Sequence, residues 1–219
     1  MLLSRSSKIA VALAAGMGVG AASPVTIFEE PFAQFDAARW REIEVKGRTE
    51  YAVEMLEGVS CLRAYSHSGA SIVLARSRFH PRAYPWLSWK WRVDRFVDGE
   101  NLGRKDGSDA SARVYVYFDT PGLPWQKRSL DYVWSTALPA GTILESAYSK
   151  ASKIIVVESG AASQGQWRWA VRNIEDDYRR CFGHNPPDAV SIGLMVDTDN
   201  TRSEALAYFD DIRVSREHP

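Results

Sequence analysis

The chain has 219 residues, of which 45% are hydrophobic and 25% are charged, and its 27 basic residues balance its 27 acidic ones. This composition is typical of a globular protein with one sizeable core. The balanced charge supports neither nucleic-acid binding nor a general attraction to anionic surfaces.

Residues 1–21 are predicted to be a signal peptide, which leaves residues 22–219 as a single domain. Arg5 and Lys8 precede an apolar run over residues 9–22, and small residues stand at the expected cleavage site. The run is shorter than the ~20 apolar residues that span a bilayer, so we expect no stable membrane insertion after cleavage. An uncleaved N-terminal anchor is the alternative. Since no cysteine lies near the cleavage site, the sequence favours a periplasmic or secreted protein over a lipoprotein.

Short runs of β-branched and aromatic residues recur from Thr26 onward, separated by Gly, Pro, Asp and Ser. This spacing predicts an all-β fold, an antiparallel jelly-roll β-sandwich. The predicted strands are 41–45, 51–55, 60–65, 71–76, 86–94, 112–119, 129–134, 153–158, 166–172, 189–197 and 207–214. A long polar loop is predicted over residues 97–111.

One short helix is predicted over residues 173–182. Asn173 is a suitable N-cap, acidic residues crowd the first turn, and Gly183 followed by two prolines ends the helix. The two cysteines are Cys181 on this helix and Cys61 in a predicted strand. The sequence leaves open whether they form a disulfide or remain buried thiols.

The predicted strand 86–94 carries the clearest functional signal. Its odd-numbered residues from Leu87 to Val93 are apolar, and its other side carries Lys90 and Arg92. Successive side chains of a strand point to opposite faces. The apolar side therefore belongs to the core, and two cations stand on the other side of what is expected to be a central strand.

Three further predicted strands also have one apolar side and one mixed side. They are residues 112–119, 166–172 and 189–197. The sets assigned to the core are Ala112, Val114, Val116, Phe118, Trp167, Trp169, Val171, Val190, Ile192, Leu194 and Val196. The opposite sets mix cations, tyrosines and small residues. If the four strands belong to one sheet, these second sides converge, and Ser191 and Gly193 leave room above the sheet.

We interpret the second side as a glycan-binding surface. Tyr and Trp rings stack on the C–H faces of sugars, and Arg and Lys donate to hydroxyls or pair with acidic groups. The excess of cations favours an acidic polysaccharide. The predicted ligand-binding residues are Lys90, Arg92, Asp109, Arg113, Tyr115, Tyr117, Trp134, Arg168 and Arg172. The alternative is an ordinary solvated sheet face on which Arg and Lys stems cover the tyrosines.

Catalysis has less support than binding. A polysaccharide lyase needs a base beside a cation, for which Tyr115 with Arg113 or Arg92 is available. None of the four histidines falls on the second side, and no nucleophile elbow, phosphate loop or zinc spacing occurs in the sequence. A polysaccharide lyase or glycoside hydrolase, and an envelope structural or interaction protein without a small-molecule site, remain the alternatives.

The segment 197–201 is rich in oxygen ligands, but it lacks the glycine and the glutamate that an EF-hand loop requires. As a turn closed by Asx hydrogen bonds it needs no metal. A structural Ca²⁺ is the one cofactor for which the sequence offers ligands. The candidates are Asp197, Asp199 and Asp210, the last with Glu29 or Glu30.

A set of ordered motifs adds a family resemblance. The motifs are residues 84–93, 109–116, 132–134, 167, 172–174, 177–180, 182–183, 197–201 and 207–212. Together they resemble the bacterial domain-of-unknown-function family numbered 3047. The resemblance implies exported proteins with a sandwich related to galactose-binding-like and concanavalin-like modules. It carries no established activity, and this chain has Ala170 where the family often has an acidic residue.

Overall fold

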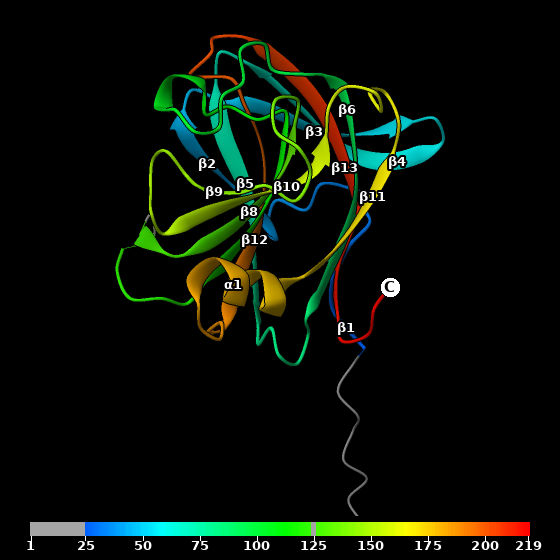
Figure 1. The fold of residues 1–219 in the computed structure, drawn as a ribbon. Helices are drawn as coiled ribbons and strands as arrows, with labels where there is room; N and C mark the ends of the chain where they lie inside the picture. The colour runs from blue at the N-terminus through cyan, green and yellow to red at the C-terminus, as the bar shows by residue number, and fades with distance from the viewer. Residues whose placement is uncertain (1–24, 124–125) are drawn as a thin grey trace, which may run out of the picture.

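The computed structural model describes residues 25–123 and 126–219 and confirms the predicted jelly-roll sandwich of two packed sheets (Figure 1). The predicted signal peptide lies outside the described residues. Among the residues described, no helix has the length and apolar character needed to cross a bilayer. The predicted polar loop contains one 3₁₀ turn, η1 (Lys105–Gly107).

Two sheets form the layers of the sandwich. The six-stranded sheet has the order β11-β6-β13-β4-β3, with β1 paired to β13. Its strands are β1 (Thr26–Glu30), β3 (Thr49–Leu56), β4 (Val59–His67), β6 (Trp86–Arg95), β11 (Arg168–Asn173) and β13 (Glu204–Ser215). The seven-stranded sheet has the order β2-β5-β12-β7-β8-β10-β9. Its strands are β2 (Trp40–Lys46), β5 (Ala70–Phe79), β7 (Ala112–Phe118), β8 (Ser129–Ser135), β9 (Ile143–Glu145), β10 (Ser152–Ser159) and β12 (Ala189–Asp197).

Two short strands and one pairing depart from the sequence prediction. β1 and β9 were not predicted, since both are short and β1 ends in two glutamates. β8 and β10 pair in parallel, whereas all strands were expected to be antiparallel. The chain between them passes through β9, which pairs antiparallel with β10 and so returns the chain in its original direction.

Four fully buried rings, which we call the aromatic layer, join the two sheets: Trp89 and Trp91 of β6, and Tyr132 and Trp134 of β8. The ring centroids of Trp89 and Tyr132 lie 5.4 Å apart, and those of Trp91 and Trp134 lie 5.8 Å apart. Aromatic pairs at such distances are favourable beyond their burial alone. The predicted core side of residues 86–94 is thereby confirmed.

The predicted core side of residues 166–172 is wrong. Trp169 pairs with Lys90 on the outer side and is 44% exposed, whereas Ala170 pairs with Trp89 and is buried in the core. Directly paired residues of antiparallel strands share a face. Because the large Trp89 already fills the space beside this edge strand, the core takes the small residue of β11 and the large one faces solvent.

The helix α1 (Ile174–Phe182) forms as predicted. The Asn173 side chain accepts a hydrogen bond from the backbone N–H of Asp176 at 3.1 Å, and Gly183 ends the helix with a φ of 77°. Cys61 and Cys181 are both free thiols. Burial raises the pKa of each thiol to about 11, so both are protonated at neutral pH.

The reversed face of β11 predicts an unequal response to substitution. Ala170→Leu should cost about 1–3 kcal/mol of unfolding free energy, because extra methylenes do not fit beside Trp89. Trp169→Gln should cost less than about 1 kcal/mol, because the ring lies on the solvent side of the sheet and is 44% exposed. Urea denaturation of both variants measures this. The opposite ranking would contradict the described register.

Candidate functional site

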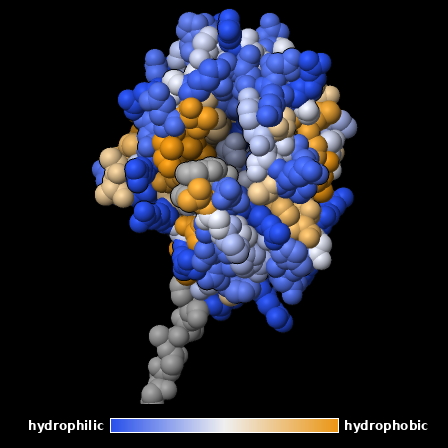
Figure 2. All heavy atoms as spheres, turned by 90° about the vertical axis from the view of Figure 1, so that its left-hand side faces the viewer, coloured by the Kyte–Doolittle hydropathy of each residue, from blue (hydrophilic) through white to orange (hydrophobic). Residues whose placement is uncertain are grey.

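A cavity of about 790 Å³ opens on the outer side of the seven-stranded sheet, away from the aromatic layer. Its lining comes from β2, β5, β12, β7, β8 and β10 and from the loop between β9 and β10. Figure 2 views this side of the molecule and shows hydrophobic side chains gathered around a hollow. Cavities of about 300–1,000 Å³ are usual for small-molecule sites.

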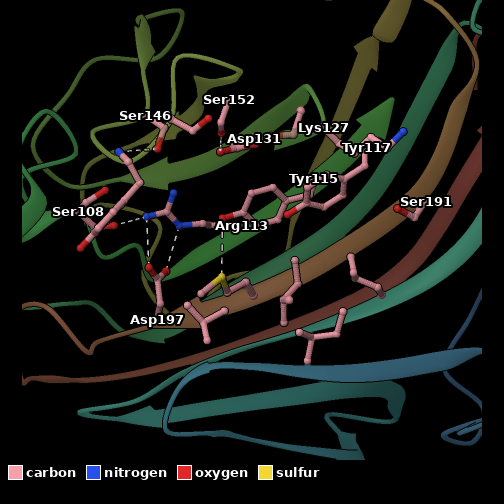
Figure 3. A pocket seen from close by; sticks show the side chains of 18 of the residues that line it. Ser108, Arg113, Tyr115, Tyr117, Lys127, Asp131, Ser146, Ser152, Ser191 and Asp197 are labelled. Carbon is pink, nitrogen blue, oxygen red and sulfur yellow. Dashed lines mark hydrogen bonds and ion pairs between the residues drawn. The ribbon is translucent and has the colours of Figure 1, made fainter. Parts of the chain in front are cut away.

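Two tyrosines of β7 stand at the centre of this cavity. The rings of Tyr115 and Tyr117 have centroids 5.5 Å apart and planes inclined by only 14°. The Tyr115 hydroxyl donates to the sulfur of Met195 at 3.6 Å (Figure 3). Ser191, the small residue expected to leave room, also lines the cavity. The structure thus brings Arg113, Tyr115 and Tyr117 together.

The floor beside the tyrosines is aliphatic. A Cβ placed on Gly193 of β12 would lie 2.7 Å from Leu74 Cδ2 and 2.8 Å from Ile72 Cδ1. The space that the sequence predicted above Gly193 is therefore taken by these two side chains of β5. Val190, predicted in the core, lines the cavity instead, because the register of β12 shifts between Ala189 and Ser191.

Arg113 is buried at the polar end of the cavity. Its Nε donates to Asp197 Oδ1 at 3.0 Å, and its Nη2 donates to Asp197 Oδ2 and to the Ser108 carbonyl. Among the described residues its third nitrogen, Nη1, has no hydrogen-bond partner, and it lies on the side of Asp131 in Figure 3. Asp197 compensates the charge of the guanidinium, and Nη1 remains as a donor.

Asp131 of β8 lies directly opposite Tyr115 in the sheet register and is also buried. It accepts hydrogen bonds from Ser129 Oγ at 2.8 Å and Ser152 Oγ at 2.5 Å. Burial nevertheless raises the pKa of Asp131 to about 6, because loss of solvent outweighs these bonds and the attraction of Arg113. Asp131 was not among the predicted site residues.

Four predicted cations lie elsewhere, so the expected convergence of one charged face is wrong. Lys90 and Arg92 belong to β6, and Arg168 and Arg172 belong to β11, all in the six-stranded sheet. Each of them pairs with a carboxylate. The partners are Asp211 for Lys90, Asp94 and Glu57 for Arg92, Glu158 for Arg168, and Asp177 for Arg172.

Two more of the predicted ligand-binding residues stabilise the fold itself. Trp134 belongs to the aromatic layer, and its Nε1 donates to the Gly160 carbonyl at 2.9 Å. Asp109 is buried and accepts hydrogen bonds from the backbone N–H groups of Asn200 and Thr201. It thereby holds the turn that follows β12 at one end of the cavity.

Carboxylate oxygens of Asp109, Asp197 and Asp199 all lie within 4.8 Å of one another. Asp210 stands on β13 in the other sheet, so the three predicted metal ligands do not come together. The clustered oxygens already have protein partners, among them Arg113 for Asp197 and Lys46 for Asp199. A calcium ion at this cluster stays a prediction.

Proton abstraction by Tyr115 is not supported by its surroundings. Burial raises the pKa of this phenol well above its usual value, despite the nearby Arg113. A lyase base needs to lose its proton near the working pH. The chemistry that the cavity supports is hydrogen bonding by Arg113 and Asp131 beside an apolar surface.

Comparison with known families gives a match over most of the chain. The family model described as "Protein of unknown function (DUF3047)" matches residues 38–213, which confirms the resemblance drawn from the sequence motifs. No curated protein matches the chain.

The chain is also distantly similar to several solved structures. The xylan-binding domain CBM22-1 of Xyn10C from Paenibacillus barcinonensis is 10% identical, with a TM-score of 0.44, covering 89% of this chain and 97% of that one. CBM27-1 of Caldicellulosiruptor saccharolyticus, in complex with mannohexaose, is 10% identical at 0.43, covering 91% and 100%. The xyloglucanase domain of NopAA from Sinorhizobium fredii, in complex with cellobiose, is 9% identical at 0.46, covering 83% and 95%. At TM-scores this low, nothing about the ligand of this chain follows from them.

The raised pKa of Asp131 predicts a specific pH dependence of stability. The folded protein holds the Asp131 proton more tightly than the unfolded chain, so ionisation between about pH 4 and pH 7 destabilises the fold. The unfolding free energy of the wild type minus that of Asp131→Asn should fall by about 1–3 kcal/mol over this interval. Denaturant titrations at both pH values measure this difference.

The exposed Asp98 provides the control, since its carboxyl loses little solvent on folding. Asp98→Asn is measured in the same way, as a control for the removal of one carboxyl group. A flat difference for Asp131→Asn would contradict a raised pKa.

Proposed function

We propose that this chain, which belongs to the DUF3047 family, binds a carbohydrate in the cavity on the outer side of the seven-stranded sheet. One observation carries this proposal: two nearly parallel tyrosine rings line the cavity beside the hydrogen-bonding groups of Arg113 and Asp131. A sugar presents C–H faces that stack on aromatic rings and hydroxyls that need donors and acceptors.

The charges of the cavity support a neutral glycan over the acidic one that the sequence favoured. Each lining cation already has an acidic partner. Arg113 pairs with Asp197, Lys46 with Asp199 at 3.4 Å, and Lys127 with Asp119 at 3.2 Å. A uronate or sulfate would have to compete with these carboxylates. The hydroxyls of a neutral glycan need only the hydrogen-bond donors of the cavity that these carboxylates leave unpaired.

The same arrangement supports binding without turnover. A glycoside hydrolase needs two carboxyl groups that flank the scissile bond. Of the carboxylates that line the described cavity, Asp197 is held by Arg113 and Asp199 is paired with Lys46, which leaves Asp131 alone. The cavity itself argues against an envelope protein without a small-molecule site. The predicted signal peptide supports a periplasmic or secreted place of action.

A glycan array with wild type and two tyrosine variants tests this function. Tyr117→Ala removes a ring of the cavity, and Tyr65→Ala is the matched control, because Tyr65 is a half-buried tyrosine of β4 in the other sheet. Wild type and Tyr65→Ala should bind a neutral glycan, and Tyr117→Ala should bind it about tenfold more weakly.

Three results would contradict the proposal or part of it. The absence of any bound glycan, or unchanged binding by Tyr117→Ala, would overturn carbohydrate binding in this cavity. Preference for acidic glycans would overturn the assignment of a neutral ligand. Release of shorter products from a bound polymer would replace the binding role with a hydrolase or lyase.

A further inference from the structure

The lining of the cavity changes from polar to aliphatic across the sheet. We define the polar half by Arg113, Ser129, Asp131 and Ser152, and the aliphatic half by Ile43, Val45, Ile72, Leu74 and Met195. The polar half lies on β7, β8 and β10, and the aliphatic half lies on the middle of β2, β5 and β12. Toward their ends, β2 and β12 also contribute the polar lining residues Lys46, Ser191 and Asp197. The two tyrosines of β7 stand between the halves.

The register of the strands fixes this gradient in space. Tyr115 lies opposite Asp131 on one side and Gly193 on the other, and Gly193 lies opposite Leu74. Along the next row, Met195 lies opposite Ile72, and Ile72 lies opposite Ile43. Since opposed residues share a face, a path across the sheet leads from the carboxyl group to aliphatic side chains.

The aliphatic half is partly open to solvent. Ile43 is 41% exposed and Val45 is 62% exposed, while Ile72 and Met195 are largely buried in the cavity floor. A glycan that extended over this half would place hydroxyls against side chains that neither donate nor accept hydrogen bonds. Such desolvation without compensation is unfavourable. An apolar group over the same side chains lowers the free energy, because its own surface and that of the side chains are both removed from water.

We infer that the ligand is an amphiphile, a glycan that carries an acyl or alkyl chain. Its sugar occupies the polar half and stacks on the tyrosines, and its chain lies over the aliphatic half. This inference rests on the proposed function, because it places the sugar in the same cavity. It adds the substrate class: a glycolipid or an acylated sugar, taken up as a single molecule.

Calorimetric titration of the full chain with three probes tests the inference. The probes are methyl β-D-glucopyranoside, octyl β-D-glucopyranoside below its micellar concentration, and octanoate. The octyl glucoside should bind about tenfold or more tightly than the methyl glucoside, since burial of two methylenes suffices for that gain. Octanoate, which lacks the sugar, should bind more weakly than the octyl glucoside.

The outcomes separate this inference from the proposed function. Equal affinity of the methyl and octyl glucosides, or binding of neither, would overturn the amphiphile, while the glycan array decides carbohydrate binding independently. Octanoate binding as tight as that of the octyl glucoside would show that the sugar contributes nothing, and would overturn the proposed function in this cavity.

A matched pair of isoleucine variants tests where the alkyl chain of the ligand lies. Ile43→Ser should weaken octyl glucoside binding by about threefold or more, and should weaken methyl glucoside binding by a smaller factor, because only the octyl chain covers Ile43. Ile27→Ser is the control, because Ile27 is 40% exposed on β1 of the other sheet. It should change neither affinity. Equal effects of the two variants would overturn the placement, and thermal unfolding establishes that both are folded.

Discussion

The aromatic layer is the constraint on which the positions of the β6 cations and of the cavity tyrosines depend. Trp89 and Trp91 of β6 meet Tyr132 and Trp134 of β8 between the sheets. Each strand that packs one side against this layer turns its other side to solvent. The solvent-facing sides of the two sheets lie on opposite surfaces of the sandwich. The cations of β6 and the tyrosines of β7 therefore belong to two separate surfaces, and the cavity described above opens on the second one.

Alternation along a strand determines which residues share a side, but it does not determine which sheet the strand joins. The sequence therefore grouped Arg113, Tyr115 and Tyr117 correctly and added Lys90 and Arg92 from a strand of the other layer. The ends of α1 were predictable for a different reason. Its N-cap and its glycine stop act through bonds within a few residues, so no distant contact is needed to place them.

Two parts of the candidate site could not be predicted from the sequence, because the role of their residues depends on which side chains lie beside them in the fold. Asp131 interrupts an apolar strand, which is unusual for a buried position, but its importance emerges only when Tyr115 and Arg113 lie beside it. Ile72 and Leu74 have the hydrophobicity of core residues in the sequence. Only the packing of β5 against Gly193 shows that they face away from the core and form the floor of the cavity.

The position of β2 has a consequence for solubility. It is the outermost strand at one end of its sheet, and its unpaired backbone edge lies beside the open isoleucine and valine of the cavity. Such an edge is a template for a strand of another molecule. Glu42, Glu44 and Lys46 alternate with those apolar residues, so an incoming copy of the chain would meet charges at every second position. The charges of β2 thus oppose pairing with a second copy of the chain, although an exposed apolar patch lies beside the strand.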